Sequence, residues 1–385
     1  MLDRKDGRAQ AKEDVLIISL MCYTVGNRLS ENGGEMEQNP MKPVILLTGA
    51  TGSVGLETLR ELLRRSDRYR VRVFSLDTPQ ERAILQPFEK RIEIVWGDLR
   101  SPENVRKAVD GVDAVLHVAA IIPPLADEKP QLAYDVNTGG TRNLLDAMQT
   151  QPTPPRIVYT SSISVYGDRV QAPWIRVGDP LNPSVGDEYA RTKIAAEEMV
   201  QDSGLPWTIF RLSGILNPHL EMQPLMFHLP LDTALEWTHN SDTGLALVNA
   251  LDHFDELDGR IFNLGGGEKC RVIARDFIRK TMEITGVNPD ALPEYAFATQ
   301  NFHSGYYADG DDLESILHFR RKTLADHYAE VAAGIPPWRR ALNRMIPASV
   351  TRRYLEGLSE PLKALRENDT ALIERFYGSQ VPKIA

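Results

Sequence analysis

The chain has 385 residues, of which 42% are hydrophobic and 25% charged, a composition that excludes a disordered chain and predicts a large globular core. Its formal net charge of −9 repels a polyphosphate backbone, so we expect a small-molecule partner and no nucleic acid. Two cysteines, Cys22 and Cys270, are too few for a disulfide framework, and the eight histidines show no metal-ligand pairing. We therefore expect no metal and a reducing, cytoplasmic location.

The first 40 residues carry no pattern of a folded domain. Their apolar stretch at residues 15–25 is about half of the ~20 residues needed to cross a bilayer. Basic residues precede it, as in a signal peptide, but Glu13 and Asp14 adjoin it and no small-residue cleavage site follows. We expect residues 1–40 to be a disordered leader rather than a secretion signal.

A glycine-rich turn follows the first predicted strand. Residues 44–47 are a continuous apolar run, typical of a strand that a parallel sheet buries on both faces. They lead into Gly49, Gly52 and Gly55, and a leucine-rich helical pattern follows at residues 56–63. Glycines between strand and helix let a pyrophosphate approach the backbone and the helix N-terminus. The sequence therefore predicts a dinucleotide site at this turn.

Alternating strands and helices continue beyond the turn. A second strand is predicted at residues 71–76, and Asp77 follows it about 20 residues beyond the last glycine. An acid there accepts hydrogen bonds from the ribose hydroxyls and repels a 2′-phosphate, which favours NAD while leaving NADP open. Further strands are predicted at residues 92–96, 114–118 and 156–160. The alternation predicts an α/β fold with a Rossmann-type doubly wound parallel sheet.

A serine cluster and a helix supply the candidate catalytic residues. The fifth strand delivers Ser162 to the carboxyl edge of the sheet, and a later helix carries Tyr189 and Lys193 on one face. A tyrosine with its ordinary pKa of about 10 is a poor base, but a neighbouring ammonium and a nicotinamide cation both favour its phenolate. Ser162 would then hold the substrate oxygen while Tyr189 moves the proton that accompanies hydride transfer.

Taken in order, five motifs resemble the extended short-chain dehydrogenase/reductases, the NAD-dependent epimerase/dehydratase family. They are TGATGSVG at 48–55, GDL at 97–99, HVAA at 117–120, TSSISVYG at 160–167 and YARTK at 189–193. The resemblance covers about residues 41–334 and implies an NAD-using enzyme and a homodimer. It implies a cofactor site lined by Gly49, Thr51, Gly52, Ser53, Val54, Gly55, Asp77, Asp98, Leu99, Ala119, Ala120, Asn137, Tyr189 and Lys193. It places Ser162, Tyr189 and Lys193 as the catalytic triad and Asn137 in a supporting role.

Departures from the family's patterns narrow the range of reactions that we expect. Dehydratases of the family carry an Asp-Glu pair where Ile163 and Ser164 stand, so we do not expect dehydration. Sugar-nucleotide epimerases often use an arginine to bind the diphosphate, and residues 234–242 contain none. The leading hypothesis is an NAD(P)-dependent oxidoreductase acting at a secondary alcohol or ketone carbon. The alternatives are a UDP-sugar type 4-epimerase with tightly bound NAD and a non-catalytic NAD-binding module.

The substrate side of the cleft is expected to be apolar. Residues 119–124 and 224–227 supply apolar side chains. The expected substrate contacts are Ile121, Ile122, Ser162, Ser164 and Ser213. We expect residues 41–215 to form the NAD(P)-binding domain with the catalytic residues. Residues 216–335 are expected to form a smaller C-terminal substrate-binding subdomain, with a strand near residues 261–264 returning to the sheet.

The C-terminal extension, residues 336–385, is predicted to be basic and helical. Val350, Tyr354, Leu358 and Leu362 recur at intervals of four and give one apolar face. Such a face packs on the body of the protein, on a partner subunit or on a membrane surface. The sequence leaves these three alternatives open, with residues 336–366 as the contact segment.

Overall fold

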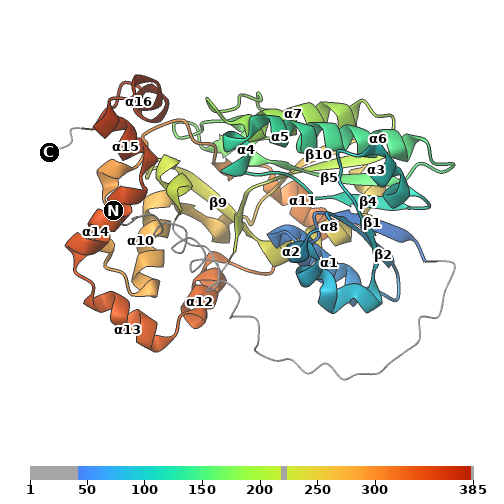
Figure 1. Ribbon diagram of the computed structural model, residues 1–385, viewed down its shortest axis with the longest axis horizontal. Coiled ribbons are helices and arrows are strands. Elements are labelled where there is room, and N and C mark those ends of the chain that lie inside the picture. Colours follow the sequence, from blue (N-terminus) through green and yellow to red (C-terminus); the bar gives the residue numbers. More distant parts are fainter. Residues whose placement is uncertain (1–41, 218–222, 383–385) are drawn as a thin grey trace, which may run out of the picture. The chain divides into compact units, whose positions relative to one another are not determined.

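The computed structural model describes residues 42–217 and 223–382 (Figure 1). The leader expected at residues 1–40, including Cys22, lies outside the described residues. One compact unit begins at Lys42 and includes the C-terminal extension.

A seven-stranded parallel sheet forms the centre of this unit, in the order β10-β7-β5-β4-β1-β2-β3. Its strands are β1 (Val44–Thr48), β2 (Arg70–Ser75), β3 (Glu93–Trp96), β4 (Ala114–His117), β5 (Arg156–Ser162), β7 (Trp207–Leu212) and β10 (Arg260–Leu264). The chain runs outward from β1 to β3 and then returns to place β4 on the other side of β1. Such a switch point is where doubly wound sheets bind ligands. The predicted Rossmann-type fold is confirmed.

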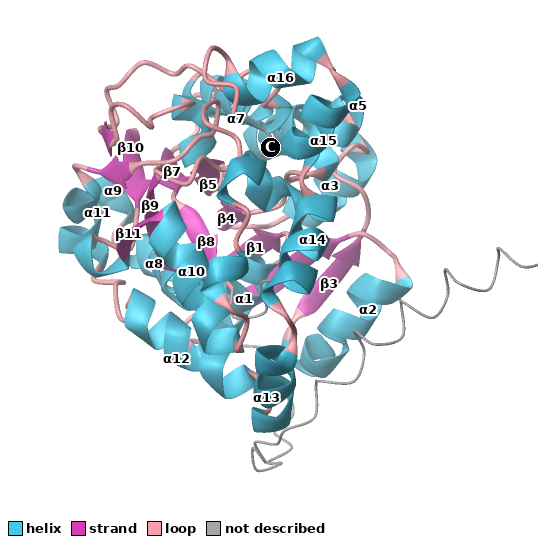
Figure 2. Ribbon diagram, turned by 90° about the vertical axis from the view of Figure 1, so that its left-hand side faces the viewer, coloured by secondary structure: helices cyan, strands magenta, loops and turns pink. Residues whose placement is uncertain are grey.

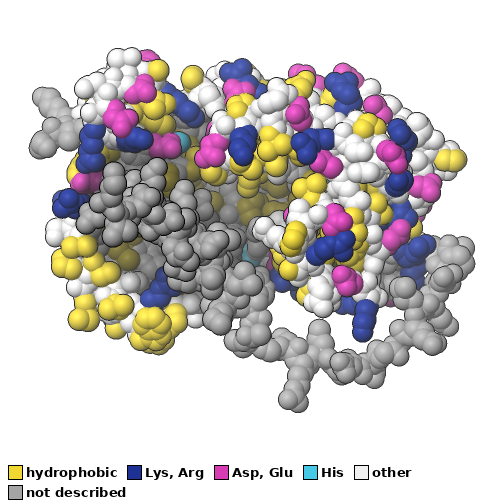
Figure 3. Space-filling model, in the orientation of Figure 1, with side chains coloured by type: hydrophobic (Ala, Val, Ile, Leu, Met, Phe, Trp, Pro, Cys, Tyr) yellow, Lys and Arg dark blue, Asp and Glu magenta, His cyan; other side chains and the backbone are white. Residues whose placement is uncertain are grey.

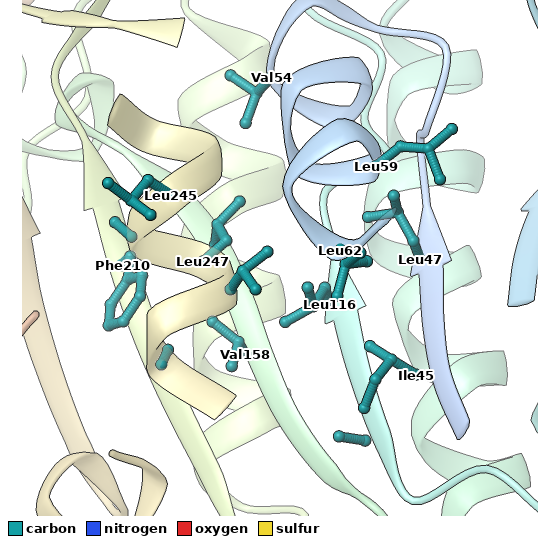
Figure 4. Packing of buried hydrophobic residues seen from close by; sticks show 14 of the residues in the cluster. Ile45, Leu47, Val54, Leu59, Leu62, Leu116, Val158, Phe210, Leu245 and Leu247 are labelled. Atoms are coloured by element: carbon teal, nitrogen blue, oxygen red, sulfur yellow. The ribbon is translucent and has the colours of Figure 1, made fainter. Parts of the chain in front are cut away.

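Helices cover both faces of the sheet because successive strand residues point to opposite sides. Ile45 and Leu47 of β1 pack into one hydrophobic cluster, and Val44 and Leu46 pack into another. The helices over the first face are α1 (Ser53–Arg64), α8 (Asn240–Asp252) and α11 (Gly310–Leu317). The helices over the second face are α3 (Pro102–Val109), α6 (Gly140–Gln149) and α7 (Glu188–Gln201). Figure 4 shows the first cluster, with leucines of α1 and α8 directed at the strands. Figure 2 shows the strands enclosed by helices.

Smaller elements complete the unit. Two minor sheets consist of β8 (Gly214–Leu216), β9 (Ala234–His239) and β11 (Arg271–Ile273), and of β6 (Trp174–Ile175) and β12 (Tyr306–Tyr307). The shorter helices are α2 (Pro79–Leu85), α4 (Leu125–Glu128), α5 (Pro130–Ala133), α9 (Phe254–Leu257), η3 (Gln86–Arg91), η5 (Ile163–Tyr166), η6 (Pro224–His228), η7 (Glu268–Cys270), η8 (Pro289–Ala291), η9 (Glu294–Ala296) and the π-helical η4 (Tyr134–Gly139).

The C-terminal part of the chain is helical and partly built into a third hydrophobic cluster. Its helices are α10 (Ala274–Thr285), α12 (Leu324–Gly334), α13 (Pro337–Met345), α14 (Ala348–Leu358), α15 (Glu360–Glu367) and α16 (Thr370–Tyr377). Leu355 of α14 and Leu362 of α15 join Leu235, Phe277 and Leu324 in that cluster. The extension is therefore anchored to the body through α14 and α15, because their buried leucines share a core with β9, α10 and α12.

Candidate functional site

A cleft of about 920 Å³ lies at the carboxyl ends of the central strands and extends to α16. The predicted residues that line it are Gly49, Thr51, Gly52, Ser53, Val54, Gly55, Asp98, Leu99, Ala119, Ala120, Ile121, Ile122, Ser162, Tyr189, Lys193 and Ser213. Three predicted site residues, Asp77, Asn137 and Ser164, are not among the lining residues. The structure thus brings the glycine turn and the three candidate catalytic residues into one continuous cleft.

Two glycines of the turn after β1, Gly49 and Gly55, have no room for a side chain. Gly49 has a φ of +73°, and a Cβ there would lie 2.7 Å from the backbone of Ala119. A Cβ on Gly55 would lie 1.9 Å from the carbonyl oxygen of Gly49. Gly52 is the N-cap of α1, and no side chain of the described chain caps this helix end. Unpaired backbone N–H groups at a helix N-terminus form a cradle for an anionic group.

A buried hydrogen-bond chain holds the next segment against this turn. Thr48 Oγ1 accepts the backbone N–H groups of Val118 and Ala119, each at 3.2 Å, and lies 2.7 Å from His117 Nδ1. Because Thr48 donates its own hydrogen to Nδ1, the other ring nitrogen of His117 donates to Thr141 Oγ1 at 3.0 Å. Burial lowers the pKa of His117 to about 3, so the ring is neutral. Sequence reasoning assigned no role to Thr48, His117 or Thr141, although His117 stands inside a motif that it used.

The helix α7 positions the candidate acid/base. Its N-cap Asp187 accepts the backbone N–H of Ala190 at 2.8 Å, which starts the helix just before Tyr189. Lys193 follows one turn later on the same face. Its Nζ donates to the carbonyl oxygen of Thr160 at 2.8 Å and lies 5.8 Å from the ring centroid of Tyr189.

Burial governs the protonation of this pair in the free protein. It raises the pKa of Tyr189 well above its usual value, and the hydrogen bond with Ser162 opposes this only in part. It also lowers the pKa of Lys193 to about 7. Removal from water disfavours both the phenolate and the ammonium, so Tyr189 is neutral at pH 7 without a ligand. The lowered pKa of Tyr189 is predicted for the combined charges of Lys193 and a nicotinamide cation, and it stays a prediction for the cofactor-bound protein.

Asp77 does not lie where the sequence placed it. The strand β2 ends at Ser75, one residue earlier than expected, and the Asp77 side chain is 53% exposed and paired with Arg82 at 2.5 Å. Ser75 and Glu81 line the cleft instead, and Ser75 Oγ donates to Glu81 Oε2 at 2.6 Å. The carboxylate that lines this end of the cleft therefore comes from Glu81 of α2.

Asn137 lies behind the cleft wall rather than in it. Its side chain accepts the backbone N–H of Ile121 at 2.7 Å and donates to the Ile121 carbonyl oxygen at 2.9 Å. It also donates to Thr192 Oγ1 of α7 at 3.0 Å. Asn137 thus ties the segment that carries Ile121 to the helix that carries Tyr189.

The predicted substrate serines differ in position. Ser213 lines the cleft, and its hydroxyl is 2.8 Å from Thr238 Oγ1. Ser164 is fully buried in η5, and its backbone N–H donates to Ser162 Oγ at 3.2 Å. Ser164 therefore orients Ser162 from below the surface and is not a substrate contact.

Comparison with known proteins shows which family part of the chain is similar to. Residues 46–205 match the 3-beta hydroxysteroid dehydrogenase/isomerase family. The chain is 37% identical over 166 residues to the 3 beta-hydroxysteroid dehydrogenase/Delta 5→4-isomerase of Mycobacterium tuberculosis, covering 40% of this chain and 41% of that protein. It is 31% identical over 163 residues to D-erythronate dehydrogenase of Cupriavidus necator, covering 41% and 49%. These matches support the resemblance of the chain to the extended short-chain dehydrogenase/reductases.

Solved structures share the fold of this chain. The dTDP-glucose 4,6-dehydratase of Bacillus anthracis, crystallised in complex with NAD, matches with a TM-score of 0.63 at 18% identity and covers 76% of this chain and 96% of its own. The match to the two curated relatives spans less than half of their length. The shared sequence therefore concerns mainly the nucleotide-binding half of the fold.

Beyond the matched region, the C-terminal part of this chain closes one end of the cleft. Arg375 and Phe376 of α16 and His228 of η6 are lining residues. The Arg375 guanidinium packs on Gly186, where a Cβ would lie 3.0 Å from its Cζ. Gly186 has a φ of +77° and immediately precedes the N-cap of α7. Sequence reasoning missed these residues, because helical periodicity in the extension does not reveal which distant surface a helix contacts.

Proposed function

We propose that the protein is an NAD-dependent oxidoreductase that transfers a hydride at a secondary alcohol or ketone carbon, with Tyr189 as the acid/base. The supporting observation is the single cleft that contains the glycine turn, Ser162, Tyr189 and Lys193. No other group of lining residues combines a hydroxyl pair with a buried amine among the described residues of this cleft.

The glycine turn fits a dinucleotide. Side chains at Gly49 or Gly55 would occupy the space between the turn and the neighbouring backbone, and the N-terminus of α1 is uncapped within the described chain. Several solved structures with the same fold were crystallised with NAD. When bound, NAD supplies a hydride acceptor and a positive charge beside Tyr189. The turn residues would hold its pyrophosphate, and Lys193 would hold the nicotinamide ribose.

The chain's own residues would transfer the proton to and from the substrate oxygen. Ser162 and Tyr189 would both hydrogen-bond the substrate oxygen, and Ser162 is oriented for this by the backbone N–H of Ser164 at 3.2 Å. Tyr189 would take the alcohol proton during oxidation and return it during reduction. Because burial raises the pKa of Tyr189 in the free protein, a phenolate needs nearby positive charge. Lys193 in its ammonium form would provide part of that charge.

The adenosine end of the site would use Ser75 and Glu81. Their hydrogen-bonded pair lines the cleft, whereas Asp77 is paired with Arg82 outside it. A carboxylate at Glu81 would accept a ribose hydroxyl and repel a 2′-phosphate, which favours NAD over NADP. Glu81→Gln should lower the NAD-over-NADP ratio of kcat/KM about tenfold or more, because a charged acceptor is lost. Asp77→Asn is the matched comparison, and a larger fall there would make Asp77 the ribose acceptor after all.

The substrate is proposed to be an apolar alcohol or ketone. Ile121, Ile122 and Phe376 line the cleft beyond the catalytic residues, as do Leu225 and Phe302. Apolar walls favour substrates that gain by leaving water. Relatives named as hydroxysteroid dehydrogenases agree with this class.

The test is to incubate the full chain with NAD and a panel of secondary alcohols of increasing hydrophobicity, and to measure NADH by its absorbance. We expect NADH to form, and kcat/KM to rise with the apolar area of the substrate. Interconversion of a UDP-sugar without net NADH would make the protein a 4-epimerase and would contradict the proposal. Binding of NAD without turnover of any substrate would identify a non-catalytic module.

A further inference from the structure

The helix α13 is oriented with its polar side toward the body and its apolar side toward solvent. Arg340 donates to the carbonyl oxygen of Ala332 at 2.7 Å, and Asn343 Nδ2 donates to the carbonyl oxygen of Thr285 at 2.8 Å. None of the residues of α13 is buried. Amphipathic helices of globular proteins normally place their apolar stripe against the core. The orientation of α13 is the reverse.

The outward side of α13 is a continuous apolar stripe. Trp338, Leu342 and Met345 follow one another at helical spacing and are 69%, 54% and 78% exposed. The stripe continues into the next segment, where Ile346, Val350 and Tyr354 are exposed too. We call these six residues the α13–α14 face. Figure 3 shows hydrophobic side chains gathered at the lower left of this view, where Figure 1 places α13 and α14.

The face is anchored from behind by α14. Leu355 is buried in the third hydrophobic cluster, and Arg352 donates to the carbonyl oxygen of Asp290 at 2.6 Å. These contacts fix the helix so that Val350 and Tyr354 remain on the outer side. The exposed stripe is therefore part of the folded architecture.

The segment of chain that carries the face contains arginines and no acidic residue. From residue 331 to residue 355 the chain carries five arginines, at positions 339, 340, 344, 352 and 353, and neither aspartate nor glutamate. Arg339, Arg344 and Arg353 are exposed. The whole chain has a formal charge of −9, so this segment is a local reversal of its charge. A surface that combines exposed apolar side chains with positive charge is complementary to one that is apolar and anionic.

We propose that the α13–α14 face docks on the surface of a membrane that contains anionic lipids. Trp338 and Tyr354 are of the residue types that favour the interface between headgroups and acyl chains, and Leu342 and Met345 would enter the apolar layer. The arginines would contact the lipid phosphates. In the described ranges, no helix is long and apolar enough to cross a bilayer, so the contact would lie along the surface.

A second copy of the chain fits this face less well. A symmetric dimer places the same patch of both subunits in contact, so the arginines around one α13 would face those around the other. Like charges brought together in this way oppose association. The charge pattern therefore favours an anionic lipid surface over self-association.

The test measures flotation of the full chain with vesicles of phosphatidylcholine alone and of phosphatidylcholine mixed with phosphatidylglycerol. The wild type should bind the anionic vesicles and bind the neutral ones much more weakly, and added salt should weaken the binding. A variant with Arg339, Arg344 and Arg353 changed to Gln should lose about tenfold or more of its affinity for the anionic vesicles. Leu342→Ser combined with Met345→Ser should lose a similar amount, although its charge is unchanged.

A charge-matched control separates the face from general electrostatic attraction. Changing Arg64, Lys90 and Lys107 to Gln removes three positive charges from exposed sites on α1, η3 and α3. This control should bind within about twofold of the wild type, and circular dichroism should show that all variants are folded. Equal losses in the control and the arginine variant would overturn the proposal, as would absence of binding or equal binding to both kinds of vesicle. A dimer that Leu342→Ser and Met345→Ser dissociate, without any vesicle binding, would also overturn it.

Discussion

The helices α7 and α13 both depart from the rule that apolar side chains lie inside and polar ones outside, but in opposite senses. The helix α7 buries Lys193 and Glu197. The helix α13 buries nothing and exposes Trp338 and Met345. Each arrangement is unfavourable by itself, since buried charges lose hydration and exposed apolar surface orders water.

The two helices differ in whether the described chain supplies partners that offset these unfavourable arrangements. In α7 the partners are present: Lys193 Nζ donates to Thr160, and Glu197 accepts from Arg211 at 2.6 Å. In α13 no element of the described chain covers the exposed stripe. We therefore propose that α7 holds groups that act inside the molecule, whereas α13 offers its apolar side chains to a contact outside it. The following changes test this contrast, beginning with the largest expected effect.

Tyr189→Phe removes the proposed acid/base from α7. Turnover of the best substrate should fall roughly 10²–10⁴-fold in kcat, because general acid–base catalysis contributes that much. NAD affinity and the free energy of unfolding should change little. Tyr159→Phe is the matched control, because its hydroxyl is buried without a hydrogen-bond partner among the described residues and its ring also lies beside Lys193 at 4.8 Å. Equal losses in both variants would remove Tyr189 from the acid/base role.

Glu197→Ala leaves the Arg211 guanidinium buried without its carboxylate. Three hydrogen bonds join the pair, at 3.0 and 3.3 Å from Nε and 2.6 Å from Nη2, and both side chains are almost fully buried. Urea denaturation should show a loss of about 3–5 kcal/mol in the free energy of unfolding, the usual effect of breaking a buried pair. The neighbouring exposed Glu198→Ala should cost less than about 0.5 kcal/mol. A small effect at both positions would mean that water reaches Arg211.

Lys193→Met tests whether the buried lysine of α7 lowers the free energy of unfolding. Burial lowers the pKa of Lys193 from its ordinary value of 10.5 to about 7. Below pH 7 Lys193 is protonated in both the folded and the unfolded chain, so burial of its charge destabilises the folded chain to the full extent. Between pH 7 and about 10.5 the folded chain has already released it, so the wild type gains stability relative to the variant, by about 1.4 kcal/mol per unit of pH.

Unfolding measured from pH 6 to pH 10 should therefore show Lys193→Met more stable than the wild type at pH 6, with a difference that shrinks as the pH rises. The variant should lose activity at every pH. A stability difference that does not change with pH would show that burial does not depress the pKa of Lys193.

Much of the candidate site around α7 could be predicted from the sequence, because its arrangement depends on local sequence patterns. Each of these patterns specifies the geometry of one or two neighbouring elements. They are the apolar run of β1, the glycines that follow it, and the four-residue spacing of Tyr189 and Lys193. The position of Asp77 could not be predicted as reliably. A strand that ends at Ser75 and an arginine five residues beyond Asp77 together remove that carboxylate from the cleft.

The exposure of apolar residues on α13 and α14 could not be predicted in this way, because it depends on contacts between distant segments. The four-residue spacing of Val350, Tyr354, Leu358 and Leu362 indicates one apolar face, yet Val350 and Tyr354 are exposed and Leu362 is fully buried. A helix ends at Leu358 and another begins at Glu360, so the stripe does not continue in one direction. Periodicity alone does not determine which part of such a stripe packs on the body.

The smallest expected effect is on α13 itself. Leu342→Ser should change the free energy of unfolding by less than about 0.5 kcal/mol, because the Leu342 side chain lies on the surface and more than half of it stays exposed in the folded chain. Leu362→Ala in α15 is the comparison, and it should cost about 2–5 kcal/mol because it leaves a cavity in the third cluster. Chemical denaturation of both variants without lipid gives the two values. If Leu342→Ser were as destabilising as Leu362→Ala, the stripe would be packed within the folded chain, and its apolar surface would need no external partner.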